Sequence, residues 1–202
     1  MNKILKIMDK LNSIEYGFKD KNGNNLINSE SWNKDFYKFY SLLSPEELLS
    51  SKCGVCWDQV ELERKLFNDA SIDCDTYFIY IDDNENLPSH TFLTFQLNNK
   101  YYWFEHSWYD MKGIHEYNNI EALLNDVKIK FIESRKNEID SSLKYDTYIY
   151  KYNKPKYHLN CDEFYNYIKT QERVNIWYIY LYKLKNENWY DKIMSGCDIY
   201  AI

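Results

Sequence analysis

Cys56, His90 and Glu105 belong to the three residue types that cooperate when a thiol acts as a nucleophile, and they follow one another along the chain in that order. A thiol becomes nucleophilic when its thiolate is stabilised, which the free N–H groups and positive dipole end of a helix N-terminus achieve. Cys56 follows Gly54 and opens a run of good helix formers without a breaker, so we expect it at the start of a helix. A histidine within hydrogen-bond reach would take the thiol proton, and a carboxylate would orient the imidazole.

The turn between the strands that carry His90 and Glu105 decides whether these two side chains can meet. Asn98-Asn99 is typical of a two-residue hairpin loop. With that loop, His90 and Glu105 lie on one face of the hairpin as diagonal neighbours, about 7–8 Å apart at the backbone and within reach of a hydrogen bond. A three-residue loop would instead place His106 beside His90. We favour the two-residue loop, and with it Glu105 as the residue that orients His90.

Capping patterns and apolar periodicity predict the elements that position these residues. Ser44-Pro45-Glu46-Glu47 combines an N-cap serine, a proline at the first helical position and a glutamate at the third, which predicts a short helix over about 44–51. The other predicted elements are a helix at the start of segment 1–43, a helix from Cys56, strands over 76–81, 90–97, 101–106 and 146–152, helices over about 118–137 and 161–170, and a final strand over 174–184. This order indicates an α+β chain with an antiparallel meander.

Three segments together resemble the transglutaminase-like superfamily of papain-fold cysteine enzymes. They are Gly54-Val55-Cys56-Trp57, His90-Thr91-Phe92-Leu93 and Trp103-Phe104-Glu105-His106-Ser107-Trp108. Members of this superfamily carry a Gly-x-Cys-Trp-type turn at a helix start, a histidine that opens a strand, and an acid that ends the next strand. The resemblance covers residues 44–110. The chain departs from the pattern at the acid, because members usually have Asp, commonly followed by Pro, where this sequence has Glu105 and His106.

The resemblance implies an α+β fold with a papain-like core, in which the helix that carries the catalytic cysteine packs against an antiparallel sheet. It also implies a Cys-His-Glu triad: Cys56 attacks a carbonyl carbon, His90 takes and returns the proton, and Glu105 holds His90 in the right tautomer. The expected activity is cysteine-dependent acyl transfer, or hydrolysis of an amide or peptide bond, through a thioester intermediate. The expected partner is a protein or peptide substrate, or a small amide or amine.

Two alternatives to this activity stay open. Arylamine N-acetyltransferases share the Cys–His–acid order and the fold, so an acyltransferase of that kind is the alternative enzyme. A binding protein that keeps the fold but performs no chemistry is the alternative of a different class. Within the enzyme interpretation, the backbone N–H of Cys56 should contribute to an oxyanion hole. Its second donor is expected from Tyr16, Trp32 or another aromatic residue of the N-terminal segment.

Cys53 and Cys56 also form a C-x-x-C pair, which is found in redox sites and in zinc sites. A zinc site would need a second Cys or His pair at suitable spacing, and a redox pair would be expected after a parallel βαβ unit. The sequence has neither pattern, and it has no glycine loop for phosphate and no Asp-x-Asp-x-Asp-Gly calcium loop. We therefore expect the protein to use no metal and no cofactor.

Composition excludes several other classes of protein. The chain has 202 residues, of which 45% are hydrophobic, so it is not a disordered or linker-dominated sequence. Its 25 Lys and Arg residues stand against 31 Asp and Glu residues, a net charge of −6, and nucleic-acid binding needs a basic face. No segment approaches the roughly 20 apolar residues that span a bilayer, so no membrane partner is expected.

Cysteine usage and the absence of linkers give the last two expectations. The five cysteines are an odd number without an export signal, which indicates a reduced, cytoplasmic protein. The sequence shows no internal repeat, low-complexity tract or Pro/Gly linker, so we expect one domain over 1–202. Its catalytic core would span about 44–110, and 111–202 would be a C-terminal extension that completes the domain.

Overall fold

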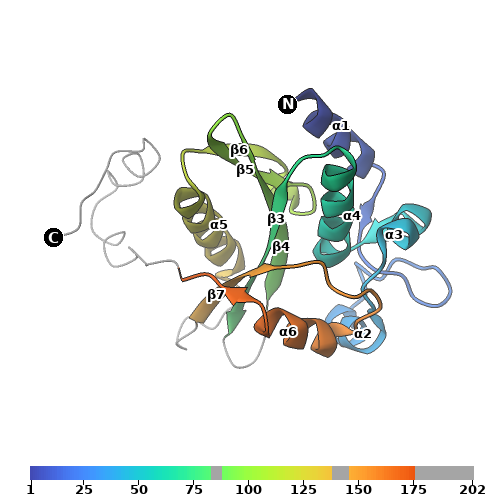
Figure 1. Ribbon diagram of the computed structural model, residues 1–202. Helices are drawn as coiled ribbons and strands as arrows, with labels where there is room; N and C mark the ends of the chain where they lie inside the picture. The colour runs from blue at the N-terminus through green and yellow to red at the C-terminus, as the bar shows by residue number, and fades with distance from the viewer. Residues whose placement is uncertain (83–87, 138–145, 176–202) are drawn as a thin grey trace.

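The computed structural model describes residues 1–82, 88–137 and 146–175, and its centre is a six-stranded antiparallel sheet (Figure 1). The strand order is β6-β5-β4-β3-β7-β8. The strands are β3 (Cys74–Asp82), β4 (Ser89–Leu97), β5 (Lys100–Glu105), β6 (Gly113–Tyr117), β7 (Asp146–Tyr152) and β8 (Glu172–Arg173). Strands β3 to β6 are neighbours both in sequence and in the sheet, which confirms the predicted meander, and the chain is α+β as predicted.

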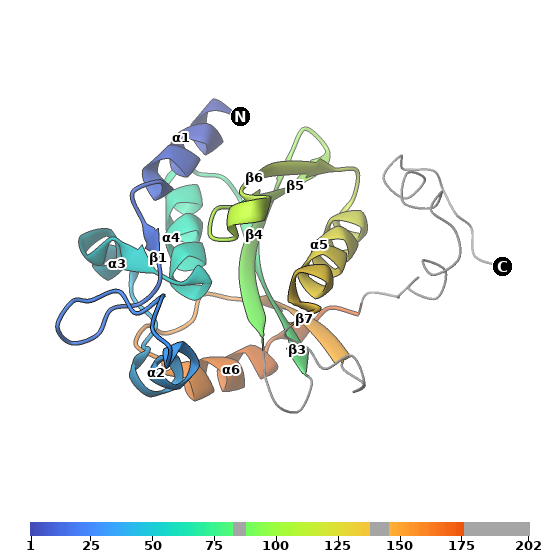
Figure 2. The same ribbon diagram turned by 180° about the vertical axis from the view of Figure 1, so that it is seen from behind.

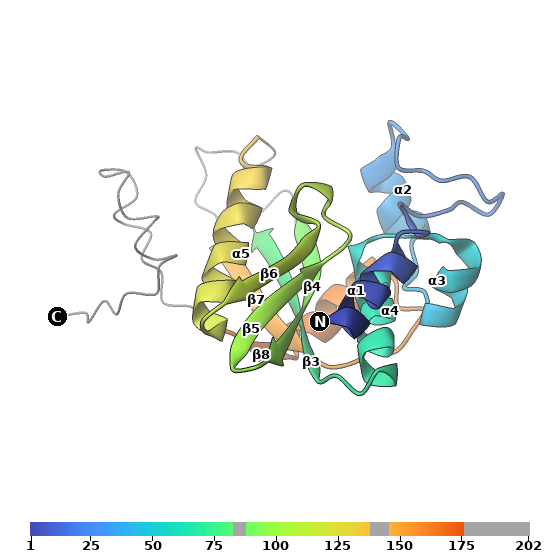
Figure 3. The same cartoon turned by 90° about the horizontal axis from the view of Figure 1, so that it is seen from above.

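Six helices surround the sheet within the described residues. They are α1 (Asn2–Leu11), α2 (Trp32–Phe39), α3 (Pro45–Ser51), α4 (Cys56–Asp69), α5 (Ile120–Arg135) and α6 (Cys161–Lys169), with a single 3₁₀ turn η1 (Tyr109–Met111). Seen from above, α5 covers one side of the sheet, while α4, α1 and α3 lie on the other side (Figure 3). None of the helices in this described part is long and apolar enough to cross a membrane.

The apolar core forms two clusters, one on each face of the sheet. Because side chains alternate along a strand, β4 contributes Leu93 and Phe95 to the cluster beneath α4, and Phe92 to the cluster beneath α5. Trp57, the second residue of α4, is 2% exposed and packs against Phe164 of α6 with ring centroids 4.5 Å apart. The start of α4 is therefore fixed from two directions, by the sheet and by α6.

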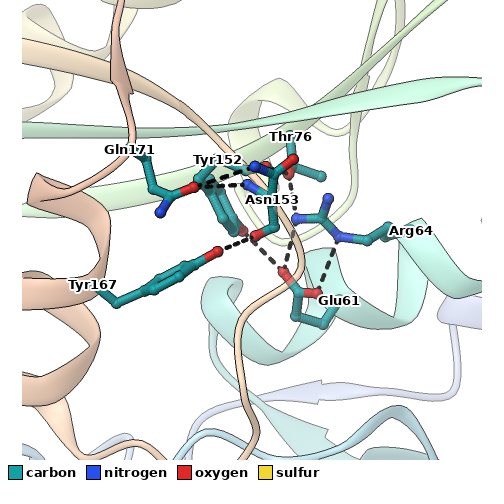
Figure 4. A network of polar contacts seen from close by, with 7 residues as sticks. All are labelled: Glu61, Arg64, Thr76, Tyr152, Asn153, Tyr167 and Gln171. Carbon is teal, nitrogen blue, oxygen red and sulfur yellow. Dashed lines mark hydrogen bonds and ion pairs between the residues drawn. The ribbon is translucent and has the colours of Figure 1, made fainter.

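A network of buried polar contacts also holds α4 against the sheet (Figure 4). The Glu61 carboxylate accepts hydrogen bonds from Arg64 in its own helix, at 3.1 Å from Nε, and from the Tyr152 hydroxyl of β7, also at 3.1 Å. The Arg64 guanidinium in turn donates to the Thr76 hydroxyl of β3. Because the Glu61 side chain is fully buried, removal of Arg64 would leave an uncompensated charge in the core. The network therefore fixes α4, and with it the position of Cys56.

The elements with strong local patterns are confirmed. Helix α3 begins with the expected capping box, in which the Ser44 hydroxyl accepts from Glu47 N–H and the Glu47 carboxylate accepts from Ser44 N–H. Helix α4 begins at Cys56. The sequence did not predict α2, β6 or the two-residue strands β1 (Glu15–Tyr16), β2 (Cys53–Gly54) and β8. The strand expected at 174–184 lies almost wholly outside the described residues.

Candidate active site

The turn before α4 is built around the carboxylate of Asp58, the third residue of the helix. This carboxylate accepts hydrogen bonds from Val55 N–H at 2.9 Å, from Leu43 N–H at 2.9 Å and from the Tyr40 hydroxyl at 2.8 Å. Burial outweighs these three hydrogen bonds and raises the pKa of Asp58 to about 7. Asp58 thus caps the helix that Cys56 opens.

Glycine is required at position 54 of this turn because the surrounding atoms leave no room for a side chain. A Cβ atom at Gly54 would lie 2.5 Å from Leu48 Cδ1 and 2.9 Å from Asp58 Cβ, both closer than packed atoms approach. Gly54 also pairs in parallel with Tyr16, because β2 forms a two-stranded sheet with β1. This pairing brings the N-terminal segment to the residues directly before Cys56. Figure 2 shows β1 beside the lower end of α4.

The hairpin register that decides the partner of His90 is the expected one. Leu97 pairs with Lys100, so the loop consists of Asn98 and Asn99 alone, and both have positive φ values of 52° and 61°. Asparagine tolerates this left-handed conformation better than most residues, which is why Asn-Asn favours a two-residue loop. His90 and Glu105 consequently face each other, and His90 Nε2 lies 2.8 Å from Glu105 Oε2.

Glu105 is held in one orientation by four hydrogen bonds. Besides His90, its Oε2 accepts from the indole N–H of Trp103 at 3.2 Å. Its Oε1 accepts from the hydroxyl of Ser107 at 3.1 Å and from the backbone N–H of Trp108 at 2.8 Å. Glu105 is only 2% exposed, so these contacts replace water around the carboxylate. A carboxylate fixed in this way holds the His90 ring in place.

The Cys56 thiol and the His90 imidazole lie close enough that each shifts the pKa of the other. Since Nε2 of His90 faces Glu105, the ring nitrogen left for the thiol is Nδ1. Burial alone would lower the pKa of His90, but the charge of Glu105 and the hydrogen bonds with Cys56 and Glu105 raise it to about 10. His90 therefore carries a positive charge beside the sulfur at neutral pH.

The same contacts favour the thiolate form of Cys56. Burial opposes ionisation of the thiol, but the hydrogen bond and charge of His90, the backbone N–H of Thr91 and the hydroxyl of Tyr16 together lower the pKa of Cys56. The Tyr16 hydroxyl donates to Sγ at 3.9 Å. The two other buried cysteines, Cys53 and Cys161, have pKa values shifted in the opposite direction. Burial raises the pKa of Cys53, and it raises the pKa of Cys161 to about 12.

His106, which a longer hairpin loop would have placed beside His90, contacts α4 instead. Its Nδ1 donates to Gln59 Oε1 at 2.7 Å, and Gln59 Nε2 donates to the carbonyl oxygen of Gly54 at 2.9 Å. Burial lowers the pKa of His106 to about 4, so this ring is neutral. Trp32 lies in the aromatic cluster of the N-terminal segment, stacked on Phe36 with ring centroids 5.9 Å apart.

The interface between α4 and the sheet is polar around the triad. Glu63 is 3% exposed, and burial followed by the charge of Glu105 raises its pKa well above the usual range, so the carboxyl is neutral. Within the described residues, Thr91 Oγ1 and His106 Nε2 are buried without a hydrogen-bond partner. Buried polar atoms without partners are rare and cluster at functional sites. The charged run of Glu61, Glu63, Arg64 and Lys65 is typical of a solvated helix face, but Glu61 and Glu63 are buried, so that interpretation of the sequence is wrong for these two residues.

The described residues contain no group of three or more His, Cys, Asp or Glu side chains that could hold a metal ion. No protein-family model matches the chain, and a search of curated proteins returned no match. The chemistry of this site is therefore inferred from the geometry around Cys56 and from the resemblance of the three segments that carry Cys56, His90 and Glu105.

Proposed function

We propose that the protein is a cysteine-dependent enzyme that transfers an acyl group from an amide or peptide bond through a thioester on Cys56. The observation that carries the proposal is the place of His90 between Cys56, which opens a helix and whose pKa His90 lowers, and Glu105, whose Oε2 lies 2.8 Å from His90 Nε2. We also propose that the fold contains a papain-like core of the transglutaminase-like kind. A helix that opens with the cysteine and packs against an antiparallel sheet with the histidine and the acid on adjacent strands supports this assignment.

In the first half of the reaction, the Cys56 thiolate attacks the carbonyl carbon of the substrate. The C=O electron pair moves to oxygen and gives a tetrahedral intermediate, whose negative charge the helix N-terminus and the N–H of Cys56 stabilise. The intermediate collapses as the C–N bond breaks, and His90 gives its Nδ1 proton to the departing amine. The product of this half is a thioester and a neutral imidazole.

In the second half, His90 acts as the base. Its neutral imidazole takes a proton from water or from an acceptor amine, whose oxygen or nitrogen attacks the thioester carbon. Collapse of the second tetrahedral intermediate breaks the C–S bond and restores the thiolate–imidazolium pair. Water as acceptor gives a carboxylic acid, and an amine gives a new amide. In both halves Glu105 keeps the Nε2 proton of His90 in place, so that Nδ1 alone exchanges protons.

Acylation by p-nitrophenyl acetate tests the proposal directly, because this reagent needs only a reactive nucleophile and releases a coloured product. The purified protein should release p-nitrophenol in a burst of about one equivalent, and peptide mapping should find the acetyl group on Cys56. Cys74→Ser is the matched control, since Cys74 is more exposed than Cys56 but burial raises its pKa to about 11.

Cys56→Ser should abolish the burst, while Cys74→Ser should retain it. If Cys56 and Cys74 are acetylated at equal rates, or if neither is acetylated in a folded protein, the enzyme interpretation fails. The second result would favour the non-catalytic binding protein. Supplying an arylamine, or a peptide amine, to the acetylated protein then measures which acceptor discharges the thioester.

A further inference from the structure

We infer that the hydroxyl of Tyr16 is the second donor of the oxyanion hole, opposite the backbone N–H of Cys56. The inference rests on the proposed acyl transfer at Cys56. It begins from the hydrogen bond that Tyr16 donates to the sulfur, 3.9 Å from Oη to Sγ. In the tetrahedral intermediate the sulfur and the oxyanion are bonded to the same carbon. A donor that reaches the sulfur before the reaction therefore needs only a small movement to reach the oxyanion.

The position of Tyr16 relative to the base supports this role. The leaving amine must lie near His90 to receive its proton, so the carbonyl oxygen has to point away from His90. The backbone N–H of Thr91 also favours the thiolate, but Thr91 follows His90 on β4 and comes from the side of the base. Tyr16 lies on β1, which pairs with the residues immediately before Cys56. The Tyr16 hydroxyl thus reaches the sulfur from the side of β2, which leads directly into Cys56 and its backbone N–H.

The backbone of Tyr16 is fixed, as transition-state stabilisation requires of a donor. The N–H of Glu15 donates to the carbonyl oxygen of Lys52 at 2.9 Å, which anchors one side of the tyrosine to the residue directly before β2. On the other side, Asn25 Nδ2 donates to the carbonyl oxygen of Tyr16 at 3.1 Å. Gly17 follows with φ of +141°, and a Cβ there would lie 2.0 Å from Asn25 Oδ1. Glycine at this position lets the asparagine side chain reach the backbone.

Two other side chains that could serve as the donor, those of Gln59 and Trp103, are already occupied. Gln59, one turn after Cys56, has its Nε2 bound to the Gly54 carbonyl and its Oε1 bound to His106. The Trp103 indole N–H is bound to Glu105. Trp32, a candidate from the sequence, packs among the aromatic rings of the N-terminal segment.

Tyr16 is also the accessible member of the group around the sulfur. It is 40% exposed, whereas Cys56 is 4% exposed and His90 is 5% exposed. A substrate that arrives from solvent therefore meets the Tyr16 ring first. Burial of the hydroxyl and the neighbouring charge of Cys56 hold the pKa of Tyr16 well above its usual range, so the group remains an O–H donor throughout the pH range of activity.

Tyr16→Phe tests the inference, because it removes only the hydroxyl. Two reactions of Cys56 are compared: acylation by p-nitrophenyl acetate, which passes through a tetrahedral oxyanion, and alkylation by iodoacetamide, which does not. Loss of one oxyanion donor should slow acylation about 10²-fold. The Tyr16 hydroxyl also lowers the pKa of Cys56, so both reactions are measured at a pH at which Cys56 is fully ionised in both proteins. At that pH alkylation should stay within about twofold of the wild-type rate, which also shows that the site is intact. Tyr109→Phe is the matched control, since Tyr109 is 89% exposed on η1, and it should leave both rates unchanged.

The outcomes separate this inference from the proposed function. Wild-type acylation at Cys56 with no acylation defect in Tyr16→Phe would overturn the oxyanion role and leave the proposed function standing. An equal loss of acylation and alkylation in Tyr16→Phe would also overturn it, because the hydroxyl would then act on the thiolate and not on the oxyanion. A wild-type protein that is alkylated but never acylated at Cys56 would overturn the proposed function itself.

Discussion

His90 Nε2 lies 2.8 Å from Glu105 Oε2, and this single contact determines which nitrogen of the imidazole is available to Cys56. Both residues are buried, at 5% and 2% exposed, so the interaction is not shared with solvent. With Nε2 committed to the carboxylate, Nδ1 is left to exchange a proton with the thiol. The hairpin register therefore controls the chemistry that the site can perform.

Glu105→Gln should preserve the fold but lower kcat for acyl transfer on the order of 10²–10⁴-fold, by analogy with other triads. The amide keeps the size of the carboxylate but removes the charge that stabilises the protonated His90. His106→Gln should cost far less, because His106 contacts Gln59 and not His90. Asp110→Asn, on the exposed turn η1, is the control and should be nearly silent. Steady-state rates of p-nitrophenyl acetate hydrolysis measure the activity of the three variants. A larger loss in His106→Gln than in Glu105→Gln would contradict the assignment of Glu105 as the residue that orients His90.

His90→Ala should raise the pKa of the Cys56 thiol. The hydrogen bond and charge of His90 lower that pKa, and without them the burial of the sulfur, which favours the neutral thiol, prevails. The rate of iodoacetamide alkylation plotted against pH measures the shift: its midpoint should move upward, and alkylation at pH 7 should slow. His158→Ala is the control, because its side chain is 64% exposed and its ion-pair partner is Glu47, 3.9 Å away. An unmoved midpoint in His90→Ala would rule out the thiolate–imidazolium pair.

The pH dependence of amide cleavage should be bell-shaped, with its upper limb near pH 10. On the low side, activity rises as Cys56 forms the thiolate, at a pKa below the usual range for cysteine. On the high side, His90 loses its proton near its pKa of about 10 and can no longer protonate the leaving amine. The rate constant kcat/KM, measured from pH 5 to 11 for the free enzyme, tests this. An upper limb near pH 7 would show that His90 has the pKa of an ordinary histidine.

Asp58→Asn should flatten the pH dependence of stability between about pH 4 and pH 7. The folded-state pKa of Asp58 is raised from 3.8 to about 7, so the neutral carboxyl favours the folded protein. This contribution is fully present below the unfolded pKa and is lost as the pH rises through about 7. Urea unfolding at pH 4.5 and pH 6.5 should show a wild-type free energy of unfolding that falls over this interval, with a smaller fall in Asp58→Asn. Equal slopes in the two proteins would contradict the raised pKa.

Arg64→Met should destabilise the protein by about 3–5 kcal/mol, because it leaves the Glu61 carboxylate buried without its cation. Glu61→Gln combined with Arg64→Met should recover much of the loss, since no charge then remains in the core. Lys65→Met is the control on the same helix. Its ion pair with Asp69 is exposed, so no measurable change in the free energy of unfolding is expected.

Short-range patterns were sufficient to predict much of the fold and the arrangement of His90 and Glu105. The start of α3 follows from Ser44 and Glu47, which cap each other within one turn. The hairpin register follows from Asn98 and Asn99, whose tolerance of positive φ selects a two-residue loop. In each case the residues that decide the structure are adjacent or nearly adjacent in sequence, so the pattern can be recognised from the sequence alone.

The parts that sequence reasoning missed depend on contacts between distant segments. Strands β1 and β2 contain two residues each, too few for a period-2 pattern, and they exist only because they pair with each other. The contacts of Gln59 with Gly54 and His106 likewise arise from the packing of α4 on the sheet. Tyr16 was one of several aromatic candidates for an oxyanion donor, and the β1–β2 pairing, which places Tyr16 beside the residues before Cys56, could not be read from the sequence.

The parallel pairing of β1 with β2 has a consequence for how the site responds to heat. The backbone hydrogen bonds beside this pairing run from Glu15 N–H to Lys52 at 2.9 Å and from Gly17 N–H to Gly54 at 3.4 Å, and the pairing closes a long segment of chain. Short ladders of this kind open locally at far lower free energy than a central sheet. The amides of Glu15 and Gly17 should therefore exchange with deuterium well before those of β3 and β4. Catalytic rate would then fall on warming while the sheet is still folded, and it would return on cooling.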